Sequence, residues 1–232
     1  MVAAVKFWDR FADRYAARPI KDTRAYDAML ADAAGRLKPT DRVLEIGCGT
    51  GSIAIRLAPY AAAWTATDFS AAMLRIARAK PAPDNLRFVL ADAEHAVDGG
   101  PFDTICAFQV LHLVDDLPDT LSRIRAQLKP GGLLIAKTWC FADMGLGLRA
   151  LFLALRAFRL FPRANALTKA ALRRTVAEAG FVIEVEHVFG NNPHGPYTVA
   201  RNPGGAGRRT AAAGSVESRI NGAPRSGENN VE

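Results

Sequence analysis

The 232-residue sequence is poor in cysteine, with single residues at Cys48, Cys106 and Cys140. Three widely spaced cysteines cannot build a disulfide framework. No Cys-x-x-Cys pair is present, so the sequence gives no sign of a structural zinc site or of any other metal centre. We therefore predict no bound metal and a reducing, cytoplasmic setting.

Long apolar runs and dense charge are also missing. No uninterrupted apolar run approaches the roughly 18 residues that a membrane-spanning helix needs. The first residues carry Lys6, Arg10 and Arg14, so they lack the apolar core of a secretory signal. The formal net charge is +7, but it is spread thinly, and we predict no nucleic-acid partner.

Hydrophobic residues make up 50% of the chain, which is enough for one sizeable globular domain. From Asn202 onward the composition changes to Gly, Ala, Arg, Ser and Asn, with no aromatic residue. Such a segment cannot bury enough apolar area to offset its loss of conformational entropy. We predict one domain over residues 1–201 and a disordered tail over residues 202–232.

Hydrophobic periodicity predicts helices that alternate with short apolar strands. The predicted helices cover residues 1–15, 22–37, 52–58, 71–79, 115–128 and 168–179, with a short helix between 91 and 101. The predicted strands cover residues 42–46, 64–67, 86–90, 102–108, 133–138, 181–188 and 197–200. This order predicts an α/β fold with a doubly wound, mostly parallel sheet that helices cover on both faces.

An insertion over residues 141–166 interrupts this alternation. Its core, residues 146–161, is a strongly apolar predicted helix with a single cationic stripe. On a helix with 100° per residue, the stripe falls within roughly 80° and consists of Arg149, Arg156, Arg159 and Arg163. The pattern predicts either a core helix with a solvated basic edge or a peripheral contact with anionic lipid headgroups.

The most informative stretch runs from Val43 to Gly51, where an apolar strand is followed by Glu45 and then by three glycines at alternate positions. Glycine allows a positive φ and a close approach of the backbone to a ligand. In a doubly wound sheet, such a turn binds a nucleotide-like ligand at the carboxyl ends of the strands. A dinucleotide and S-adenosylmethionine are the two main candidates.

The residues around this turn favour S-adenosylmethionine. Gly51 comes one position earlier than the third glycine of the dinucleotide fingerprint, where Ser52 stands. Glu45 repels a pyrophosphate and suits a positively charged ligand. Asp68 and Asp92 end the next two predicted strands, where they are placed to accept from the ribose hydroxyls and from the adenine amine. Each aspartate has an alternative as a simple helix cap.

These motifs resemble the ordered motif series of class I S-adenosylmethionine-dependent methyltransferases, and most closely the ubiquinone/menaquinone-biosynthesis-like small-molecule branch. The matching segments are Val43–Gly51, Ala66–Ser70, Ala91–Ala93, Phe102–His112 and Leu128–Gly132. The resemblance implies a seven-stranded, Rossmann-like sheet with an antiparallel last strand, and a helical cap over the acceptor at 141–166. It implies S-adenosyl-L-methionine as the cofactor, and it does not specify the acceptor.

The resemblance also implies a set of contacts with the cofactor. The glycine turn passes beneath the methionine moiety, and a segment after residue 108 borders the methionine end. The segment at Asp68 holds the ribose and lies against adenine, and the segment at Asp92 contacts the adenine edge. The implied contact residues are Glu45, Gly47, Cys48, Gly49, Gly51, Asp68, Phe69, Asp92, Ala93, Gln109 and Val110. We add Tyr15 as a residue that either closes over the cofactor or serves in packing, and read Cys48 as a packing residue within the loop.

Methyl transfer from a sulfonium needs mainly alignment and a dry site, so no catalytic triad is expected. For a phenol or an alcohol a general base helps, and His112 is the candidate, although it could instead cap a loop. The apolar insertion, with Trp139 and Phe141 beside it, favours a small hydrophobic or aromatic acceptor that is methylated on O, C or N. Two alternatives are a nicotinamide-dependent oxidoreductase and a non-catalytic cofactor-binding accessory protein at a membrane surface.

Overall fold

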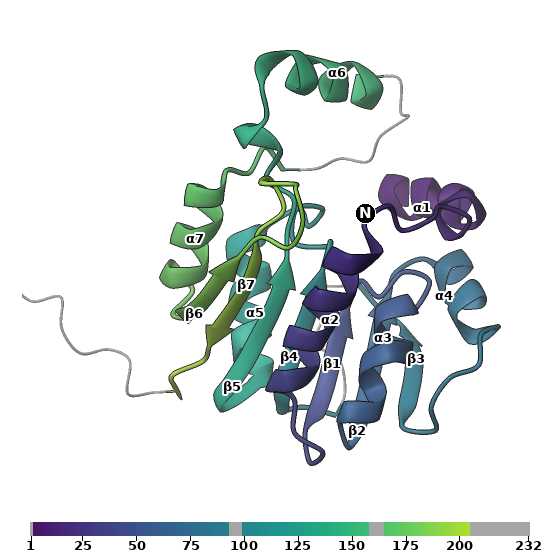
Figure 1. Ribbon diagram of the computed structural model, residues 1–232, viewed down its shortest axis with the longest axis vertical. Helices are drawn as coiled ribbons and strands as arrows, with labels where there is room; N and C mark the ends of the chain where they lie inside the picture. Colours follow the sequence, from purple (N-terminus) through teal and green to yellow (C-terminus); the bar gives the residue numbers. More distant parts are fainter. Residues whose placement is uncertain (1, 93–98, 158–164, 205–232) are drawn as a thin grey trace, which may run out of the picture.

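The computed structural model describes residues 2–92, 99–157 and 165–204 (Figure 1). Its helices are α1 (Val2–Ala16), α2 (Thr23–Arg36), α3 (Ser52–Leu57), α4 (Ala71–Arg78), α5 (Leu117–Gln127), α6 (Leu146–Ala157) and α7 (Lys169–Glu178). Its strands are β1 (Arg42–Ile46), β2 (Ala63–Asp68), β3 (Leu86–Leu90), β4 (Phe102–Phe108), β5 (Leu128–Lys137), β6 (Val182–His187) and β7 (Tyr197–Arg201). The predicted alternation of strands and helices is confirmed.

The seven strands form one sheet in the order β3-β2-β1-β4-β5-β7-β6. The pairs among β1 to β5 are parallel, and β7 lies antiparallel to both β5 and β6. This confirms the predicted doubly wound sheet with an antiparallel last strand. The chain reverses its winding direction between β1 and β4, which is where open α/β sheets bind ligands.

Alternate residues of β1 point to opposite faces of the sheet. Leu44 and Ile46 belong to a buried cluster that includes residues of α5 and α7, whereas Val43 belongs to a second cluster with residues of α2 and α3. Burying each large apolar side chain contributes about 1.5–3 kcal/mol. Glu45 points to the same face as Val43, so a carboxyl group lies within the second apolar layer at 1% exposure.

Side-chain caps fix where four of the helices begin. Each cap accepts a hydrogen bond from the backbone N–H three residues later, which typically stabilises a helix by ~1 kcal/mol. The caps are Asp22 for α2, Ser70 for α4, Asp116 for α5 and Thr168 for α7.

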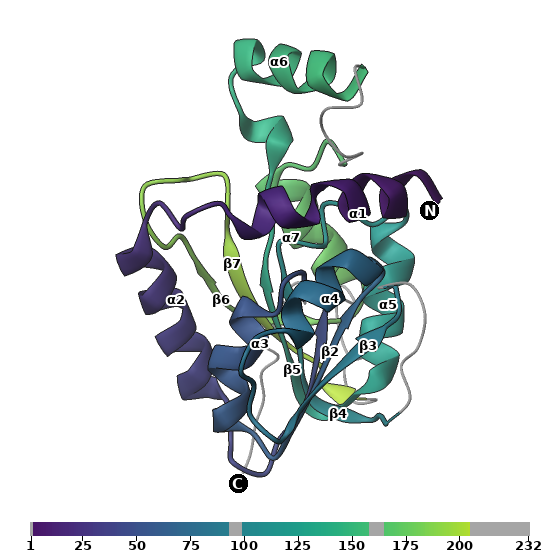
Figure 2. The ribbon, with the colours of Figure 1, turned by 90° about the vertical axis from the view of Figure 1, so that its right-hand side faces the viewer.

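Helix α1 lies across the edge of the sheet, between the sheet and α6 (Figure 2). Asp9 of α1 accepts a hydrogen bond of 2.6 Å from the hydroxyl of Ser70 and one of 3.3 Å from the backbone N–H of Ala72. An ion pair of 2.9 Å joins Asp13 to Arg75. These contacts attach α1 to the beginning of α4, immediately after β2.

Two predicted boundaries differ from the structure. Strand β5 begins at Leu128 rather than at residue 133, because Leu128 pairs with Phe102 and the Lys129 ammonium binds Asp103 at 2.7 Å. The domain also extends past the predicted limit at residue 201. Asn202 is 5% exposed and its side-chain amide donates to the Leu128 carbonyl at 3.1 Å, so it closes the end of the sheet.

Helix α6 stands apart from the sheet in both views (Figures 1 and 2). Leu146 is 80% exposed and Leu148 is 43% exposed. The predicted arginine stripe lies outside the described side chains, and the described helix ends at Ala157. The short helix predicted before β4, and the tail from residue 205, lie mostly or wholly outside the described residues. No helix within the described ranges combines the length and apolarity needed to cross a membrane.

Candidate functional site

The glycine turn connects β1 to α3. At two of its positions, the structure shows why a residue with a side chain would not fit. Gly47 has a φ of 66°, and a Cβ at this position would lie 2.6 Å from Cγ2 of Val110. Gly51 has a φ of 73°, and its Cβ would lie 2.8 Å from the ring of Phe88. Gly47 therefore lets the turn pass close to the end of β4, whereas Gly51 lets α3 pack beside β3.

Glu45 lies directly before this turn and is almost completely buried. Its Oε2 atom accepts a hydrogen bond of 3.1 Å from the indole N–H of Trp64. Burial raises the pKa of the Glu45 carboxyl to about 8, and the indole hydrogen bond only partly opposes this effect. At neutral pH this carboxyl is therefore mainly protonated until a cation comes close to it.

Asp68 ends β2 and faces the glycine turn. Its Oδ2 atom accepts from the Gly49 N–H and its Oδ1 atom from the Ser70 N–H, both at 2.8 Å. Burial raises the pKa of this carboxyl, and the backbone hydrogen bonds act in the opposite direction. Each oxygen keeps a further lone pair that can accept a hydroxyl hydrogen bond.

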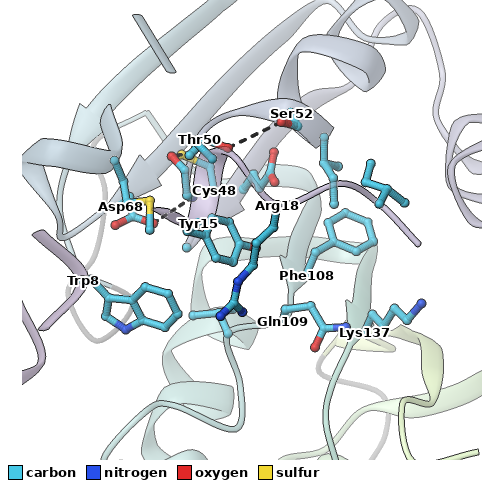
Figure 3. Close-up of a pocket in the computed structure, with 18 of the residues that line it drawn as sticks. Trp8, Tyr15, Arg18, Cys48, Thr50, Ser52, Asp68, Phe108, Gln109 and Lys137 are labelled. Atoms are coloured by element: carbon cyan, nitrogen blue, oxygen red, sulfur yellow. Dashed lines mark hydrogen bonds between the residues drawn. The ribbon is translucent and has the colours of Figure 1, made fainter. Parts of the chain in front are cut away.

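A cavity of about 570 Å³ lies at the carboxyl ends of β1, β2, β4 and β5 (Figure 3). Its size is within the range typical of small-molecule sites. Nine of the predicted cofactor residues line it: Tyr15, Glu45, Gly47, Cys48, Gly49, Asp68, Phe69, Gln109 and Val110. The structure therefore brings together residues from α1, β2 and the segments after β1 and β4.

The other three predicted cofactor contacts, Gly51, Asp92 and Ala93, are not among the described residues that line this cavity. Gly51 does not border the cavity, because its Cα faces the packing interface with Phe88 and Ala77. Asp92 is half-buried and is not part of the cavity wall. Ala93 lies outside the described residues. The adenine contact predicted for Asp92 and Ala93 stays a prediction.

A second cavity, of about 390 Å³, adjoins the first. Its wall is mostly aromatic, with two arginines, and comprises Phe7, Trp8, Phe11, Arg14, Tyr15, Arg18, Gln109, His112, Leu113, Trp139, Phe141 and Phe152. The rings of Trp139 and Phe141 are 5.3 Å apart, and those of Phe141 and Phe152 are 5.2 Å apart. The predicted contribution of the insertion to an apolar pocket is therefore visible in Phe141 and Phe152.

Five residues line both cavities and so form their shared boundary: Trp8, Tyr15, Arg18, Gln109 and Leu113. In Figure 3 the Arg18 side chain extends toward the space between the Trp8 indole and the Gln109 amide. Gln109 has a φ of 60°, a conformation that is uncommon for a residue other than glycine. Its buried Oε1 atom has no hydrogen-bond partner among the described residues. Strained backbone and an unpaired buried oxygen are typical of a ligand site.

His112 lines the second cavity and not the first. Its ring lies 5.4 Å from that of Phe141, and its buried Nδ1 atom has no hydrogen-bond partner among the described residues. Burial lowers the pKa of His112 to about 4, so the imidazole is neutral at physiological pH. A neutral imidazole beside a cavity can accept a proton or a hydrogen bond.

Of the residues by which the N-terminal helix lines the two cavities, only Tyr15 was predicted from the sequence. Trp8, Arg14 and Arg18 were not among the predicted contacts, and neither was Lys137, at the end of β5, which lines the first cavity. The sequence predicts a helix over residues 1–15. It does not show which part of the fold this helix packs against, because that depends on tertiary contacts. Burial lowers the pKa of the Lys137 ammonium.

The three cysteines are free and buried. Burial raises the pKa of Cys48 well above its ordinary value, so its thiol is not a nucleophile at neutral pH. Within the described parts of the chain, no three histidine, cysteine or acidic side chains are close enough to hold a metal ion.

A family model described as a methyltransferase domain matches residues 13–186. The chain belongs to this methyltransferase-domain family. An S-adenosylmethionine-dependent methyltransferase from Mesorhizobium loti superposes with a TM-score of 0.65 at 20% identity, over 78% of this chain and 99% of the other. A Thermotoga maritima methyltransferase superposes with a TM-score of 0.64 at 21% identity, over 86% and 99%. These likenesses show the Rossmann-like methyltransferase fold.

Relatives by sequence include the biotin biosynthesis bifunctional protein of Bordetella avium, 38% identical over 162 residues, or 62% of this chain and 34% of that protein. A malonyl-[acyl-carrier protein] O-methyltransferase of Magnetococcus marinus is 35% identical over 108 residues, or 45% and 38%. An uncharacterized methyltransferase of Mycobacterium bovis is 36% identical over 124 residues, or 53% and 62%. The matches thus span about a third to just under two thirds of these relatives. Family membership favours the methyltransferase interpretation over a nicotinamide-dependent oxidoreductase.

Proposed function

We propose that this protein is an S-adenosylmethionine-dependent methyltransferase that acts on a small, apolar acceptor. The observation that carries the proposal is the pair of adjoining cavities with a shared boundary. The first cavity contains the glycine turn and Asp68, and the second is walled mainly by aromatic side chains. A donor in one cavity and an acceptor in the other meet at that boundary.

The residues of the first cavity fit S-adenosylmethionine. Gln109 presents a buried oxygen that has no partner among the described residues, so the wall has a polar atom that a ligand can use. Asp68 has spare lone pairs for the ribose diol, and Glu45 suits the positive charge of the amino acid end. When bound, S-adenosylmethionine supplies a methyl group already activated on a sulfonium sulfur.

The second cavity supports a hydrophobic or aromatic acceptor. Its mostly apolar walls lower the polarity around the transfer site, which strengthens electrostatic interactions there. Quinol-type acceptors fit the ubiquinone/menaquinone-biosynthesis-like branch, and a malonyl thioester is suggested by the name of the Magnetococcus relative. We include both among the acceptors to be tested.

His112 is our candidate for the proton acceptor where the substrate is a hydroxyl or an amine. Its pKa of about 4 keeps the ring neutral, and its Nδ1 atom is buried in the cavity wall. A proton transfer to a neutral imidazole contributes typically 10²–10⁴-fold to a rate. A carboxylate acceptor has no proton to lose and does not need this group.

The proposal is tested by calorimetric titration with S-adenosylmethionine and with NAD, followed by an S-adenosylhomocysteine release assay across quinol, phenol, amine, carboxylate and thioester acceptors. Micromolar binding of S-adenosylmethionine with acceptor-dependent release is the expected result. Binding without release from any acceptor favours the non-catalytic alternative. Tight binding of NAD alone overturns the proposal.

We further propose a reducing, cytoplasmic setting, which the free buried cysteines support, and no nucleic-acid partner. A peripheral membrane contact through residues 146–161 is supported by the exposed Leu146 and Leu148 on α6. Co-sedimentation with phosphatidylglycerol vesicles tests this contact. The matched variant Leu146→Glu/Leu148→Glu is expected to abolish it, and unchanged co-sedimentation contradicts it.

A further inference from the structure

The face of α1 that lines the second cavity changes character along its length. Phe7, Phe11, Arg14 and, just after the helix, Arg18 follow one another at spacings of three and four residues, and all four line this cavity. Residues at this spacing share one side of a helix. The cavity therefore has an aromatic half formed by Phe7 and Phe11 and a cationic half formed by Arg14 and Arg18.

The cationic half lies toward the first cavity. Arg18 lines both cavities, whereas Phe7, Phe11 and Arg14 line only the second. No ion pair is found for Arg14 or Arg18 among the described residues, while Asp9 and Asp13 of the same helix are bound to Ser70 and Arg75. Arg14 and Arg18 are both exposed at one end of this cavity, and two guanidinium groups placed together in this way can bind a carboxylate.

His112 lies in the wall of the second cavity only, and the five residues of the shared boundary include no group suited to removing a proton. Burial and the nearby charge of Asp68 raise the pKa of the Tyr15 phenol, so it stays protonated. The other boundary residues are Trp8, Arg18, Gln109 and Leu113, none of which is a general base at neutral pH. An acceptor that is already anionic is the one that needs no base at this position.

We infer that the acceptor is an apolar carboxylic acid that lies with its carboxylate at Arg14 and Arg18 and its apolar body among the aromatic side chains of the second cavity. This inference rests on the proposed function. A lone pair of one carboxylate oxygen forms the new O–C bond while the C–S bond of the sulfonium breaks, and its electron pair remains on sulfur. The products are a neutral methyl ester and a neutral thioether, and no proton is released.

The charges of the site agree with this assignment. A carboxylate has about four lone-pair positions, so it can accept from two guanidinium groups and still present one lone pair to the methyl group. Attack of an anion on a cation neutralises both charges, and an environment less polar than water favours such a step. Lys137 lines the first cavity and not the second, so the amino acid carboxylate of the cofactor has a separate cation available.

The first test measures binding without turnover. We expect calorimetry of the full chain to show that 3-phenylpropionate and octanoate bind at least tenfold more tightly than the corresponding amides. Arg14→Ala is expected to reduce this preference for the acid to less than threefold and to leave the affinity for S-adenosylmethionine within threefold. Arg14→Lys should keep part of the preference. Arg10→Ala, which changes an arginine of α1 that lines neither cavity, serves as the matched control.

The second test identifies the product. Mass spectrometry is expected to find a methyl ester that alkali hydrolyses back to the acid, and Arg14→Ala should raise KM for the acid at least tenfold. Equal affinity for acids and amides, or methylation at another atom, overturns the inference. Release of S-adenosylhomocysteine with neutral acceptors only also overturns it while the proposed function stands.

Failure to bind S-adenosylmethionine at all overturns the proposed function itself. If Arg14→Ala does not fold, the comparison of acids with amides in the unmodified protein decides the matter.

Discussion

The carboxylate of Asp68, at the end of β2, accepts a hydrogen bond from the backbone N–H of Gly49 in the turn after β1, with 2.8 Å between Oδ2 and N. This hydrogen bond joins two neighbouring strand ends, so the groups proposed to bind ribose and methionine form one unit. The second oxygen of Asp68 accepts from the Ser70 N–H and fixes the beginning of α4. A change at this carboxylate therefore alters both the shape and the charge of the first cavity.

We predict that Asp68→Ala weakens binding of S-adenosylmethionine at least tenfold, or about 1.4 kcal/mol. The variant loses the acceptor for the ribose diol and leaves the Gly49 N–H unpaired. Calorimetry gives the affinity, and Asp27→Ala, at an exposed ion pair with Arg56, is the control. An affinity within threefold of the unmodified protein contradicts the ribose assignment.

Substitutions at two glycines of the turn are predicted to have different effects, one mainly on stability and the other mainly on the binding of S-adenosylmethionine. Gly51→Ala places a Cβ 2.8 Å from the Phe88 ring at a φ of 73°, so we expect a loss of about 2–4 kcal/mol in the free energy of unfolding. The affinity of the folded protein for S-adenosylmethionine should remain within threefold. A Cβ at Gly49 would meet only Tyr15, at 4.0 Å. We expect Gly49→Ala to lower the free energy of unfolding by about 1–2 kcal/mol because of the positive φ at this position. The same variant should bind S-adenosylmethionine more than tenfold more weakly.

Urea unfolding and calorimetry on both variants check this pair of expectations. The glycine assignments fail if Gly51→Ala loses affinity without losing stability, or if Gly49→Ala binds as tightly as the unmodified protein.

Glu45 is predicted to make both stability and binding depend on pH. Its pKa is about 8 in the folded chain and near 4.5 when exposed, so the folded state holds a proton that the unfolded state has lost between these values. This contribution to stability is complete below about pH 4.5 and decreases as the pH rises to about 8. Glu45→Gln keeps an acceptor for the Trp64 N–H and removes the titration.

We therefore expect the Tm of the unmodified protein to fall relative to that of Glu45→Gln between pH 6 and pH 8.5. Because a bound cation favours the ionised carboxylate, the affinity for S-adenosylmethionine should rise with pH up to about 8 in the unmodified protein and not in the variant. Parallel pH dependences in the two proteins would refute this role for Glu45.

His112→Gln is predicted to discriminate between acceptor classes. With a hydroxyl acceptor, loss of the neutral imidazole should lower kcat at least a hundredfold, as expected for a general base. With a carboxylate acceptor, kcat should stay within threefold, because no proton leaves. Initial-rate kinetics with a phenol and an aliphatic acid give the two values. A large loss of kcat with the acid contradicts the base-free step.

The sequence allowed the sheet and most of the first cavity to be predicted, because both depend on local patterns. Strands β3 and β4 have the predicted bounds, because each is a mostly apolar segment between residues that interrupt strands. Asp68 and the glycine turn stand at the ends of two successive strands, so their positions at one edge of the sheet could be read from the sequence. Arg18 and Lys137 could not be placed, because their positions depend on how α1 and the end of β5 pack in the folded chain. Asn202 was missed because its burial comes from tertiary hydrogen bonds and not from apolarity.

The attachment of α1 to α4 affects both cavities. The hydrogen bond from Ser70 to Asp9 and the exposed ion pair between Asp13 and Arg75 hold one helix that forms a wall of both cavities. The exposed ion pair contributes only about 1 kcal/mol or less. Because α1 forms a wall of both cavities, any displacement of this helix changes the donor site and the acceptor site at the same time.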